Sequence, residues 1–326
     1  MPANLPPQYY ELEKRCRAAS SPDEKLALLE EMLSAMPKHK GTDKLQADVK
    51  KRIAKIKAEG KKSGSAASRS TYNIKPEGAG QVALVGPPNS GKSSLLRSLT
   101  GSRPEVADYP FTTRAPLAGM AAFEDVKIQL VDLPAVTGEF LEPWVPDLIR
   151  RADLLLIILD LTGDPLHQLR EVENVLAEKR IFPAGGPGPA DGRGGLVKPD
   201  LLAANKVDAP DAEAALELFL EMIEPKREVT PLSIIRADNL DRLPGLLFQA
   251  LGLIRVYTKA PGKPAEVRSP FTLPRGSTAL DLAEKIHKDV AQAFKYARVW
   301  GKGLVDGRMV QRDHPLSDGE IVEIHT

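Results

Sequence analysis

The segment GPPNSGKSS, residues 86–94, constrains the fold more than any other part of this 326-residue chain. It matches G-x-x-x-x-G-K-[ST] directly after the apolar run QVALV and directly before a helical pattern, which is the context of a phosphate-binding loop. Its glycines let backbone N–H groups and the helix N-terminus face an anion. Lys92 is then expected to reach the β and γ phosphates, and Ser93 to offer its hydroxyl to Mg²⁺. We predict that a nucleotide contacts Gly86, Pro87, Pro88, Asn89, Ser90, Gly91, Lys92, Ser93 and Ser94.

Apolar runs and helical patterns alternate from residue 81 to residue 251. The runs QVALVG, VKIQLVD, ADLLLIILDL, DLLAANKVD and EVTPLSI are predicted strands, and helices are predicted from residue 92 and over 165–179, 210–223 and 239–251. This rhythm predicts an α/β fold, in which a mainly parallel sheet is covered by helices on both faces. Ligands of such folds bind at the carboxyl ends of the strands, where the motifs of this chain lie.

The segment VDLPAV, residues 131–136, ends one of these predicted strands with a carboxylate. Asp132 is therefore expected to hold Mg²⁺ through its water shell, together with Ser93. If this is the magnesium-side motif of a GTPase, Val136 stands where many such enzymes have a glutamine that orients the attacking water. The side chain of Val136 can neither donate nor accept a hydrogen bond.

The segment NKVD, residues 205–208, indicates which base is bound. The carboxylate of Asp208 can accept hydrogen bonds from the ring N–H and the exocyclic amine of guanine, and adenine does not offer that pair of donors. Lys206 can lay its alkyl stem over the base, and Asn205 can fix the loop. The sequence therefore predicts GTP over ATP. The base pocket is expected to be completed by the backbone of Ser233 and Ile234.

The segment DYPFTTRAP, residues 108–116, lies between the phosphate-binding loop and Asp132. A threonine in this place can ligate Mg²⁺ and sense the γ phosphate, so the segment is expected to order with GTP and loosen after hydrolysis. Thr113 is the first choice for this ligand, and Thr112 is the alternative. A polar connecting loop without a catalytic task is a third interpretation.

Composition and charge describe the setting of the chain. No apolar run is long enough to span a membrane, no secretory signal is expected, and the single Cys16 fits a reducing environment, so we expect a cytoplasmic protein. Residues 1–75 carry 16 basic and 9 acidic residues, residues 76–252 carry 17 and 26, and residues 253–326 carry 12 and 9. Basic flanks around an acidic middle suggest contact with a polyanion, although ordinary solvated surfaces would give the same balance.

The flanks are expected to form separate domains. We predict a basic helical region over 1–62, in which helical periodicity at 9–37 and 43–60 indicates a hairpin of two helices. We further predict a linker over 63–78, a GTP-binding domain over 79–252 and a small α+β domain over 253–326. Within the third of these, FPAGGPGPADGRGG (residues 182–195) has too much Gly and Pro for regular structure and is expected to be a loop, either inert or in contact with a partner.

Taken together, the motifs GPPNSGKSSLL, ADYPFTTRAPLAG, DLP and NKVD resemble those of the Obg-related translation-factor GTPases. The C-terminal segments IRVYTKAPGKPAE, FTLPRGSTALDLAEKIHKDVAQAFKYARVWG and RDHPLSDGEIVEIHT are similar to the TGS domain of the developmentally regulated GTP-binding (DRG) proteins, and MPKHKGTDKLQADVKKRIAKIKAE is similar to their helical N-terminal region. The resemblance implies a Ras-like P-loop GTPase domain with a β-grasp TGS domain, acting on or near ribosomes. TGS would be a docking module for RNA or protein.

The chain departs from this group in its magnesium-side motif, which usually continues as D-L-P-G. Here Ala135 and Val136 follow Asp132–Pro134. By this resemblance Ala135 still offers a backbone N–H to the γ phosphate, although it tolerates fewer conformations than glycine. The extra domain that eukaryotic members insert after this segment is expected to be missing. Because Val136 cannot position water, another group must assist hydrolysis. Asn89 matches the asparagine that helps hold K⁺ in related potassium-activated GTPases. The expected catalytic set is therefore Lys92, Thr113 and Asn89, with Ser93, Thr113 and Asp132 as the Mg²⁺ ligands.

Two functional hypotheses follow. The first is a GTPase with low intrinsic activity that acts as a conformational switch in translation, binding the ribosome or structured RNA through its basic helix (44–62) and TGS domain. The second is a GTP-stabilised scaffold whose hydrolysis is incidental. No aromatic residues interleave with the basic ones, so readout of a DNA sequence is not expected. A metabolic kinase is a distant third, because it has no use for NKVD.

Overall fold

The computed structural model describes residues 28–29, 31–32, 49, 74–101, 105–106, 115–138, 141–189, 194–224, 227–262, 266–301 and 307–326. The chain divides into two compact units, residues 1–72 and 73–326. The predicted N-terminal helices lie almost wholly outside the described residues, as do Thr112 and Thr113.

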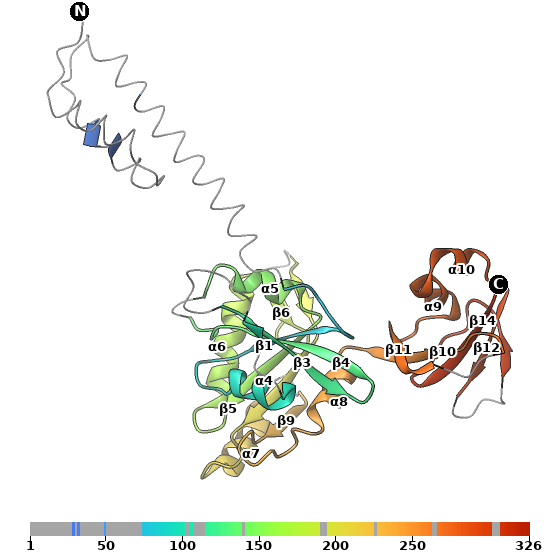
Figure 1. The fold of residues 1–326 in the computed structure, drawn as a ribbon. Coiled ribbons are helices and arrows are strands. Elements are labelled where there is room, and N and C mark those ends of the chain that lie inside the picture. Colours follow the sequence, from blue (N-terminus) through green and yellow to red (C-terminus); the bar gives the residue numbers. More distant parts are fainter. Residues whose placement is uncertain are drawn as a thin grey trace, which may run out of the picture. The chain divides into compact units, whose positions relative to one another are not determined.

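A seven-stranded sheet organises residues 73–252, in the order β2-β3-β4-β1-β5-β8-β9 (Figure 1). Strands β1, β4, β5, β8 and β9 run parallel, while β2 and β3 are antiparallel to their neighbours. The strands are β1 (Gln81–Val85), β2 (Glu105–Val106), β3 (Leu117–Phe123), β4 (Val126–Asp132), β5 (Leu154–Asp160), β8 (Asp200–Asn205) and β9 (Val229–Leu232). The predicted α/β fold with a mainly parallel sheet is confirmed.

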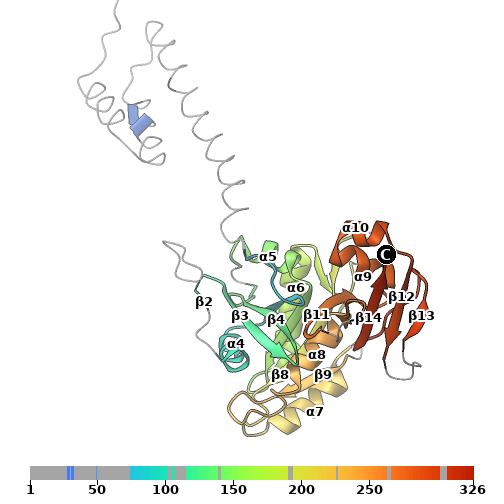
Figure 2. The ribbon, with the colours of Figure 1, turned by 45° about the vertical axis from the view of Figure 1, so that its right-hand side comes forward.

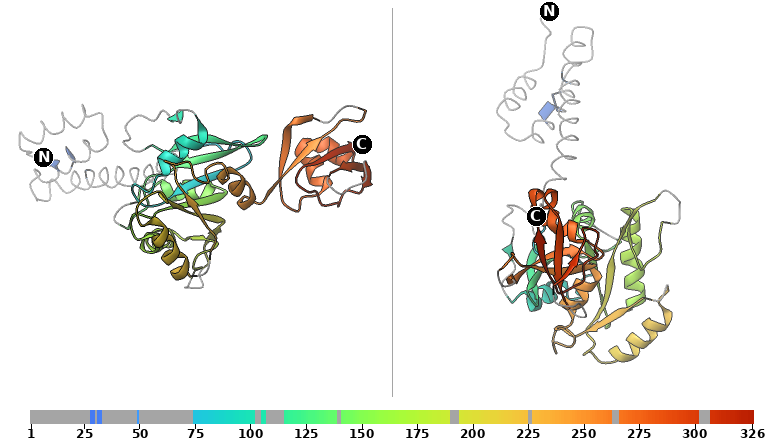
Figure 3. Two further views of the ribbon diagram at one scale, coloured as in Figure 1. Left: turned by 90° about the horizontal axis from the view of Figure 1, so that it is seen from below. Right: turned by 90° about the vertical axis from the view of Figure 1, so that its right-hand side faces the viewer.

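Helices cover both faces of this sheet because its central strands are apolar on both sides. Along β5, Leu154, Leu156 and Ile158 join the core beneath one pair of helices, and the alternate residues Leu155 and Ile157 are also fully buried. The helices are α4 (Lys92–Thr100), α5 (Val145–Arg151), α6 (Pro165–Glu178), α7 (Ala212–Met222) and α8 (Leu243–Ala250). α4 and α8 pack on the first face; α6 packs on β5 and against α7 (Figure 3).

The register of the parallel strands brings their carboxyl ends to one edge. Leu84 of β1 pairs with Asp132 of β4, and Asn205 of β8 pairs with both Asp160 of β5 and Leu232 of β9. The phosphate-binding loop, the DLP segment, the NKVD segment and Ser233 all begin or lie at these ends, so the fold collects them at the same edge.

The Gly- and Pro-rich stretch is more regular than we predicted. Its first residues belong to β6 (Ile181–Pro183), which pairs in parallel with β7 (Leu196–Lys198) in a two-stranded sheet, so the prediction of a loop over all of 182–195 is wrong at this end. The reason is hydrophobic: Ile181, Phe182 and Pro183 are buried, and this burial outweighs the low strand propensity of the neighbouring residues. Residues 190–193 lie outside the described part of the chain.

The C-terminal region has its own five-stranded sheet, in the order β11-β10-β14-β12-β13. The strands are β10 (Leu253–Thr258), β11 (Glu266–Pro274), β12 (Tyr296–Trp300), β13 (Arg308–Val310) and β14 (Glu320–His325); Figure 2 shows β14 beside β12. Its helices are α9 (Ala279–Ile286) and α10 (Lys288–Gln292). The two helices are separated at His287, which is extended (φ −168°, ψ 146°) and caps α10 through its ring.

Strand β10 is tied to the turn between β3 and β4. The guanidinium of Arg255 donates to both carboxylate oxygens of Asp318 (3.1 and 2.8 Å) and also pairs with Glu124 and Asp125 of that turn. The hydroxyl of Tyr257 donates to Asp125, and burial raises the pKa of Tyr257 to about 12. Arg255 therefore joins the β3–β4 hairpin of the first sheet to the C-terminal sheet.

Candidate functional site at the carboxyl edge of the sheet

The phosphate-binding loop needs glycine at two positions because other groups approach its backbone closely. A Cβ on Gly86 would lie 2.3 Å from the carbonyl oxygen of Ile158, and one on Gly91 would lie 2.3 Å from the side-chain nitrogen of Asn205. Gly91 also has φ +101°, which other residues adopt at a cost. The tight curl that follows presents the N-terminus of α4, and such an end attracts anions.

Lys92 lies inside this loop and is held by the loop itself. Its Nζ donates to the carbonyl oxygens of Gly86 (3.0 Å) and Pro87 (2.7 Å), and the side chain is buried. Burial lowers the pKa of Lys92 to about 8, although the nearby carboxylate of Asp132 opposes the shift. A cation held only by neutral carbonyls is a strong partner for an incoming phosphate.

Ser93 and Asp132 meet beside Lys92. The Ser93 hydroxyl donates to Oδ2 of Asp132 at 2.5 Å, whereas Oδ1 of Asp132 is buried and has no hydrogen-bond partner among the described residues. Burial raises the pKa of Asp132, and Ser93 and Lys92 oppose the shift. The hydroxyl, the carboxylate and the unsatisfied oxygen fit a hard divalent cation such as Mg²⁺, which prefers oxygen ligands. No cluster of three His, Cys, Asp or Glu side chains suited to a metal occurs in the described part of the chain.

The NKVD segment is fixed to the phosphate-binding loop and to β5. The side-chain amide of Asn205 donates to the carbonyl oxygen of Ser90 (2.8 Å), while Oδ1 of Asn205 and Oγ of Ser90 are buried without partners among the described residues. Lys206 has φ +69° and forms an ion pair with Asp160. The segment predicted to bind the base is therefore in direct contact with the phosphate-binding loop.

Asp208 and Ser233 also come together, as the sequence predicts for two parts of one base pocket. Oγ of Ser233 donates to Oδ1 of Asp208 at 2.5 Å, and this hydrogen bond lowers the pKa of Asp208. Ile234 lies near Gly91, where an added Cβ would be 3.0 Å from its side chain. Asp208 stays an ionised acceptor, which is the form that can bind guanine.

Sequence reasoning missed Asp160. Its Oδ1 accepts from the backbone N–H (2.9 Å) and hydroxyl (2.7 Å) of Thr162, and its other oxygen pairs with Lys206. Burial works against this arrangement, but hydrogen bonds from Lys206 and Thr162 outweigh it and lower the pKa of Asp160. The available signal was its place as the last residue of an apolar parallel strand, at the same edge as Asp132 and Asn205.

Val136 has no polar role in the observed structure. Its side chain is fully buried, and its backbone N–H donates to the carbonyl oxygen of Gly86 at 3.1 Å. Ala135 is half-buried beside it, and Pro88, Asn89 and Ser94 are exposed. Asn89 has φ +59°, a left-handed conformation that asparagine tolerates better than most residues.

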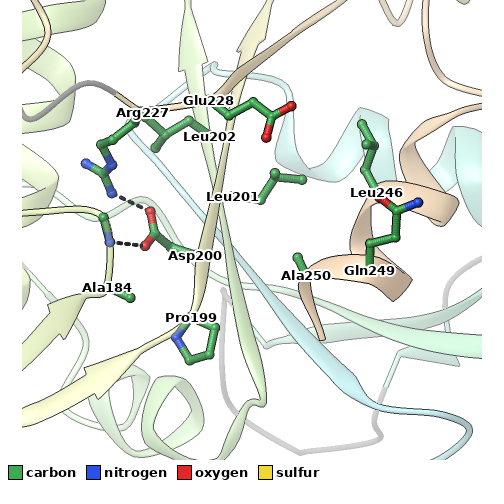
Figure 4. A pocket seen from close by; sticks show the side chains of 11 residues that line it. Ala184, Pro199, Asp200, Leu201, Leu202, Arg227, Glu228, Leu246, Gln249 and Ala250 are labelled. Carbon is green, nitrogen blue, oxygen red and sulfur yellow. Dashed lines mark hydrogen bonds and ion pairs between the residues drawn. The ribbon is translucent and has the colours of Figure 1, made fainter. Parts of the chain in front are cut away.

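A second buried polar cluster lies at the opposite edge of the sheet (Figure 4). The guanidinium of Arg227 pairs with Glu173 and with Asp200, the first residue of β8, and the backbone N–H of Gly185 donates to Asp200 at 2.8 Å. These residues border a cavity of about 560 Å³ whose other walls include Leu201, Leu246 and Ala250. Since Arg227 already faces two carboxylates, the cluster has no net positive charge with which to attract an anionic ligand.

Comparisons with known proteins agree with this architecture. Residues 81–184 match the family described as "50S ribosome-binding GTPase", and residues 254–326 match the TGS domain. The chain is 29% identical to an uncharacterized GTP-binding protein of Methanocaldococcus jannaschii, over 93% of this chain and 92% of the relative. It is 28% identical to developmentally-regulated GTP-binding protein 1 of Xenopus laevis, over 92% of this chain and 98% of the relative.

A solved structure supports the fold alone. The YchF GTPase of Schizosaccharomyces pombe superposes with a TM-score of 0.54 over 78% of this chain and all of that chain, at 14% identity.

The alignments to the two relatives extend over 360 and 364 positions, which is longer than this chain, so the relatives contain segments that it lacks. No helix in the described residues is long and apolar enough to cross a membrane.

Proposed function

We propose that this Obg/DRG-like GTP-binding protein, which joins a P-loop GTPase domain to a C-terminal TGS domain, hydrolyses GTP slowly to GDP and phosphate as a conformational switch in translation. One observation carries the nucleotide site: the three buried polar atoms that lack partners among the described residues are Oγ of Ser90, Oδ1 of Asp132 and Oδ1 of Asn205. All three belong to the predicted nucleotide-binding segments, and buried polar atoms left without partners in a native fold call for a ligand.

The proposed roles follow from the contacts. On nucleotide binding, the ammonium group of Lys92 leaves the carbonyl oxygens of Gly86 and Pro87 and binds the β and γ phosphates. The N-terminus of α4 stabilises the negative charge of these phosphates. Ser93 and Asp132 hold Mg²⁺, which when bound neutralises charge on the phosphates. Asp208 accepts from the guanine edge while the hydroxyl of Ser233 holds its carboxylate in place. Thr113 supplies the switch contact to Mg²⁺ and the γ phosphate.

Slow hydrolysis is proposed because the residue at the water-orienting position offers nothing to water. Val136 is buried and its only polar groups are those of the backbone, one of which is used by Gly86. Asn89 is exposed on the loop and is available to hold K⁺ beside the phosphates, where added positive charge would stabilise the transition state. Turnover should therefore be faster in K⁺ than in Na⁺ buffer, and Asn89→Ala should remove the difference. Equal turnover of the unaltered protein in both buffers would contradict this role.

A ribosomal or RNA partner is supported by charge and by domain composition. The N-terminal 75 residues carry an excess of seven positive charges and the last 74 an excess of three, around a domain with an excess of nine negative charges. The family matched by residues 81–184 is described as binding the 50S ribosome. A protein contact at the TGS domain is the second proposed partner.

Sedimentation with ribosomes in the presence of a non-hydrolysable GTP analogue, GDP or no nucleotide tests the switch. Cosedimentation that depends on the nucleotide, together with single-turnover hydrolysis stimulated by ribosomes, is the expected result. Cosedimentation that ignores the nucleotide would favour the GTP-stabilised scaffold, in which hydrolysis is incidental. Hydrolysis that no ribosomal or RNA component stimulates would favour the same alternative.

A further inference from the structure

Asp160 ends β5 beside the NKVD segment, and a side chain from α6 fixes its backbone. The side-chain oxygen of Gln168 accepts from the backbone N–H of Asp160 (2.8 Å), and the side-chain nitrogen donates to the backbone carbonyl of the same residue (2.9 Å). Gly163 leaves room for this contact, because a Cβ there would lie 2.9 Å from Nε2 of Gln168. Asp160 is also in register with Asn205 of β8. Its backbone is therefore held by a helix and by a neighbouring strand.

The carboxylate of Asp160 uses its two oxygens for different partners. Oδ1 accepts from the backbone N–H and the hydroxyl of Thr162, and Oδ2 pairs with the ammonium group of Lys206. The side chain of Asp160 is 14% exposed and that of Lys206 is 32% exposed, so salt screens this ion pair only weakly. Within the described residues, no other carboxylate forms an ion pair with Lys206.

Lys206 is the residue whose alkyl stem is predicted to cover one face of the guanine base. A lysine side chain is long and flexible, and ordering it on binding costs affinity. The backbone here is already constrained, because Lys206 is left-handed (φ +69°) and the N–H of Val207 donates to the carbonyl oxygen of Leu232 (3.1 Å). The ion pair with Asp160 constrains the side chain as well, so the stem is ordered before a nucleotide binds.

We propose that Asp160 is a positioning residue for the guanine base: it pre-orders the stem of Lys206, so that the stem covers the base with little further loss of side-chain entropy. The inference rests on the guanine site of the proposed function, and it adds a residue that acts through Lys206 and not by contact with the nucleotide. Its effect is opposite in sign to that of simple electrostatics. Neutralising a carboxylate near the phosphates would by itself tighten GDP binding, whereas loss of positioning weakens it.

Asp160→Asn in the full chain is the informative variant. Asparagine keeps an oxygen that can accept from Thr162, but its amide nitrogen is a donor and cannot pair with the ammonium group of Lys206. Because Lys206 is 32% exposed, the released ammonium group can reach water, and the variant should fold. Asp164→Asn is the matched control, since it removes a carboxylate from the same loop. Asp164 accepts from the backbone N–H of His167 (2.9 Å) as the N-cap of α6, and asparagine caps a helix as well as aspartate does.

Calorimetric titration with GDP should show a roughly five- to tenfold weaker affinity for Asp160→Asn. Asp164→Asn should bind GDP no more weakly than the unaltered protein. Inosine diphosphate, which lacks the exocyclic amine, should lose affinity for Asp160→Asn by the same factor as GDP, because the stem covers the face of the base and not its edge. In a Lys206→Met background, which keeps an apolar stem, Asp160→Asn should weaken binding no further, because no ammonium group remains to be positioned.

Unchanged or tighter GDP binding by Asp160→Asn would overturn the proposal. An equal loss in the Lys206→Met background would also overturn it, because Asp160 would then act on the loop and not through Lys206. A changed ratio between the affinities for GDP and inosine diphosphate would overturn it in favour of a contact with the base edge. These outcomes leave hydrolysis and ribosome binding unaffected, since only equilibrium binding is measured. A protein that binds ADP as tightly as GDP would overturn the guanine site itself, and this proposal with it.

Discussion

The seven-stranded sheet carries a buried polar cluster at each edge, and the two differ in how completely their groups are paired. At the carboxyl edge, Lys92 contacts carbonyl oxygens, and Ser90, Asp132 and Asn205 each keep an unpartnered atom within the described structure. At the other edge, Arg227 pairs with Glu173 and Asp200, and Asp200 accepts a further backbone hydrogen bond. Both clusters are buried and charged, yet only the first has polar groups to spare.

This contrast separates two uses of buried charge. A fully paired cluster holds its elements in one arrangement, since removing any member leaves the others buried and unpaired. A cluster with unpartnered buried groups lowers the stability of the ligand-free protein, and a ligand that supplies the missing partners raises that stability. Mutations at the first edge should therefore change nucleotide affinity, and mutations at the second edge should change stability.

The largest effect is expected from Arg227→Met, which keeps the apolar stem but leaves Glu173 and Asp200 buried without their cation. The free energy of unfolding should fall by about 3 to 5 kcal/mol, as measured by urea denaturation. Arg150→Met is the matched control: its partner Asp147 is 37% exposed, so the loss should stay below about 1 kcal/mol. GDP should stabilise the folded Arg227→Met protein as much as the original; a loss of GDP affinity would break the distinction between the two edges.

Lys92→Ala should have the opposite pattern. Removing a buried cation that has no carboxylate hydrogen-bond partner should leave the nucleotide-free protein as stable as before, or more so. The affinity for GDP should fall by roughly 10²- to 10³-fold, because a charge-assisted contact to phosphate is lost in a buried site. Calorimetric titration and denaturation of the same sample measure both quantities. Strong destabilisation without nucleotide would show that Lys92 is a structural residue.

Asp208→Asn tests the proposed contact between the carboxyl edge of the sheet and the guanine base. Asparagine presents both an oxygen acceptor and an N–H donor, so it should disfavour guanine and favour xanthine, whose carbonyl replaces the exocyclic amine. The affinity for GDP should fall by roughly 10- to 100-fold, and that for xanthosine diphosphate should rise. Ser233→Ala, which removes the hydroxyl that holds Asp208, should weaken GDP binding less and leave base preference unchanged. An Asp208→Asn protein that still prefers GDP would contradict the assigned base contact.

The two edges also differ in how far the sequence predicted them. The phosphate-binding loop, Asp132 and NKVD are predictable because each follows an apolar strand. Each also contains residue types that suit one ligand, namely phosphate, Mg²⁺ and guanine. Glu173, Asp200 and Arg227 carry no such signal: they come from a helix, a strand start and a connecting segment, and only helix packing and strand register bring them together. Asp160 does end an apolar strand, but its role depends on a partner, Lys206, that lies 46 residues away.

The smallest effect is a pH dependence that should appear at the carboxyl edge alone. Burial lowers the pKa of Lys92 from 10.5 to about 8, so between these values the unfolded chain binds more protons and the nucleotide-free protein should become more stable as pH rises. Phosphate favours the charged form, so GDP binding should take up a proton and weaken above pH 8, by at most about tenfold per pH unit. Titrations in two buffers with different ionisation enthalpies measure this uptake.

The rise in stability with pH is isolated by subtracting the stability profile of Lys92→Ala from that of the unaltered protein. If the difference between the two free energies of unfolding stays flat from pH 7 to pH 10, Lys92 titrates normally. Guanidinium groups keep their charge throughout this pH range. Subtracting the stability profile of Arg227→Met should therefore give no such slope.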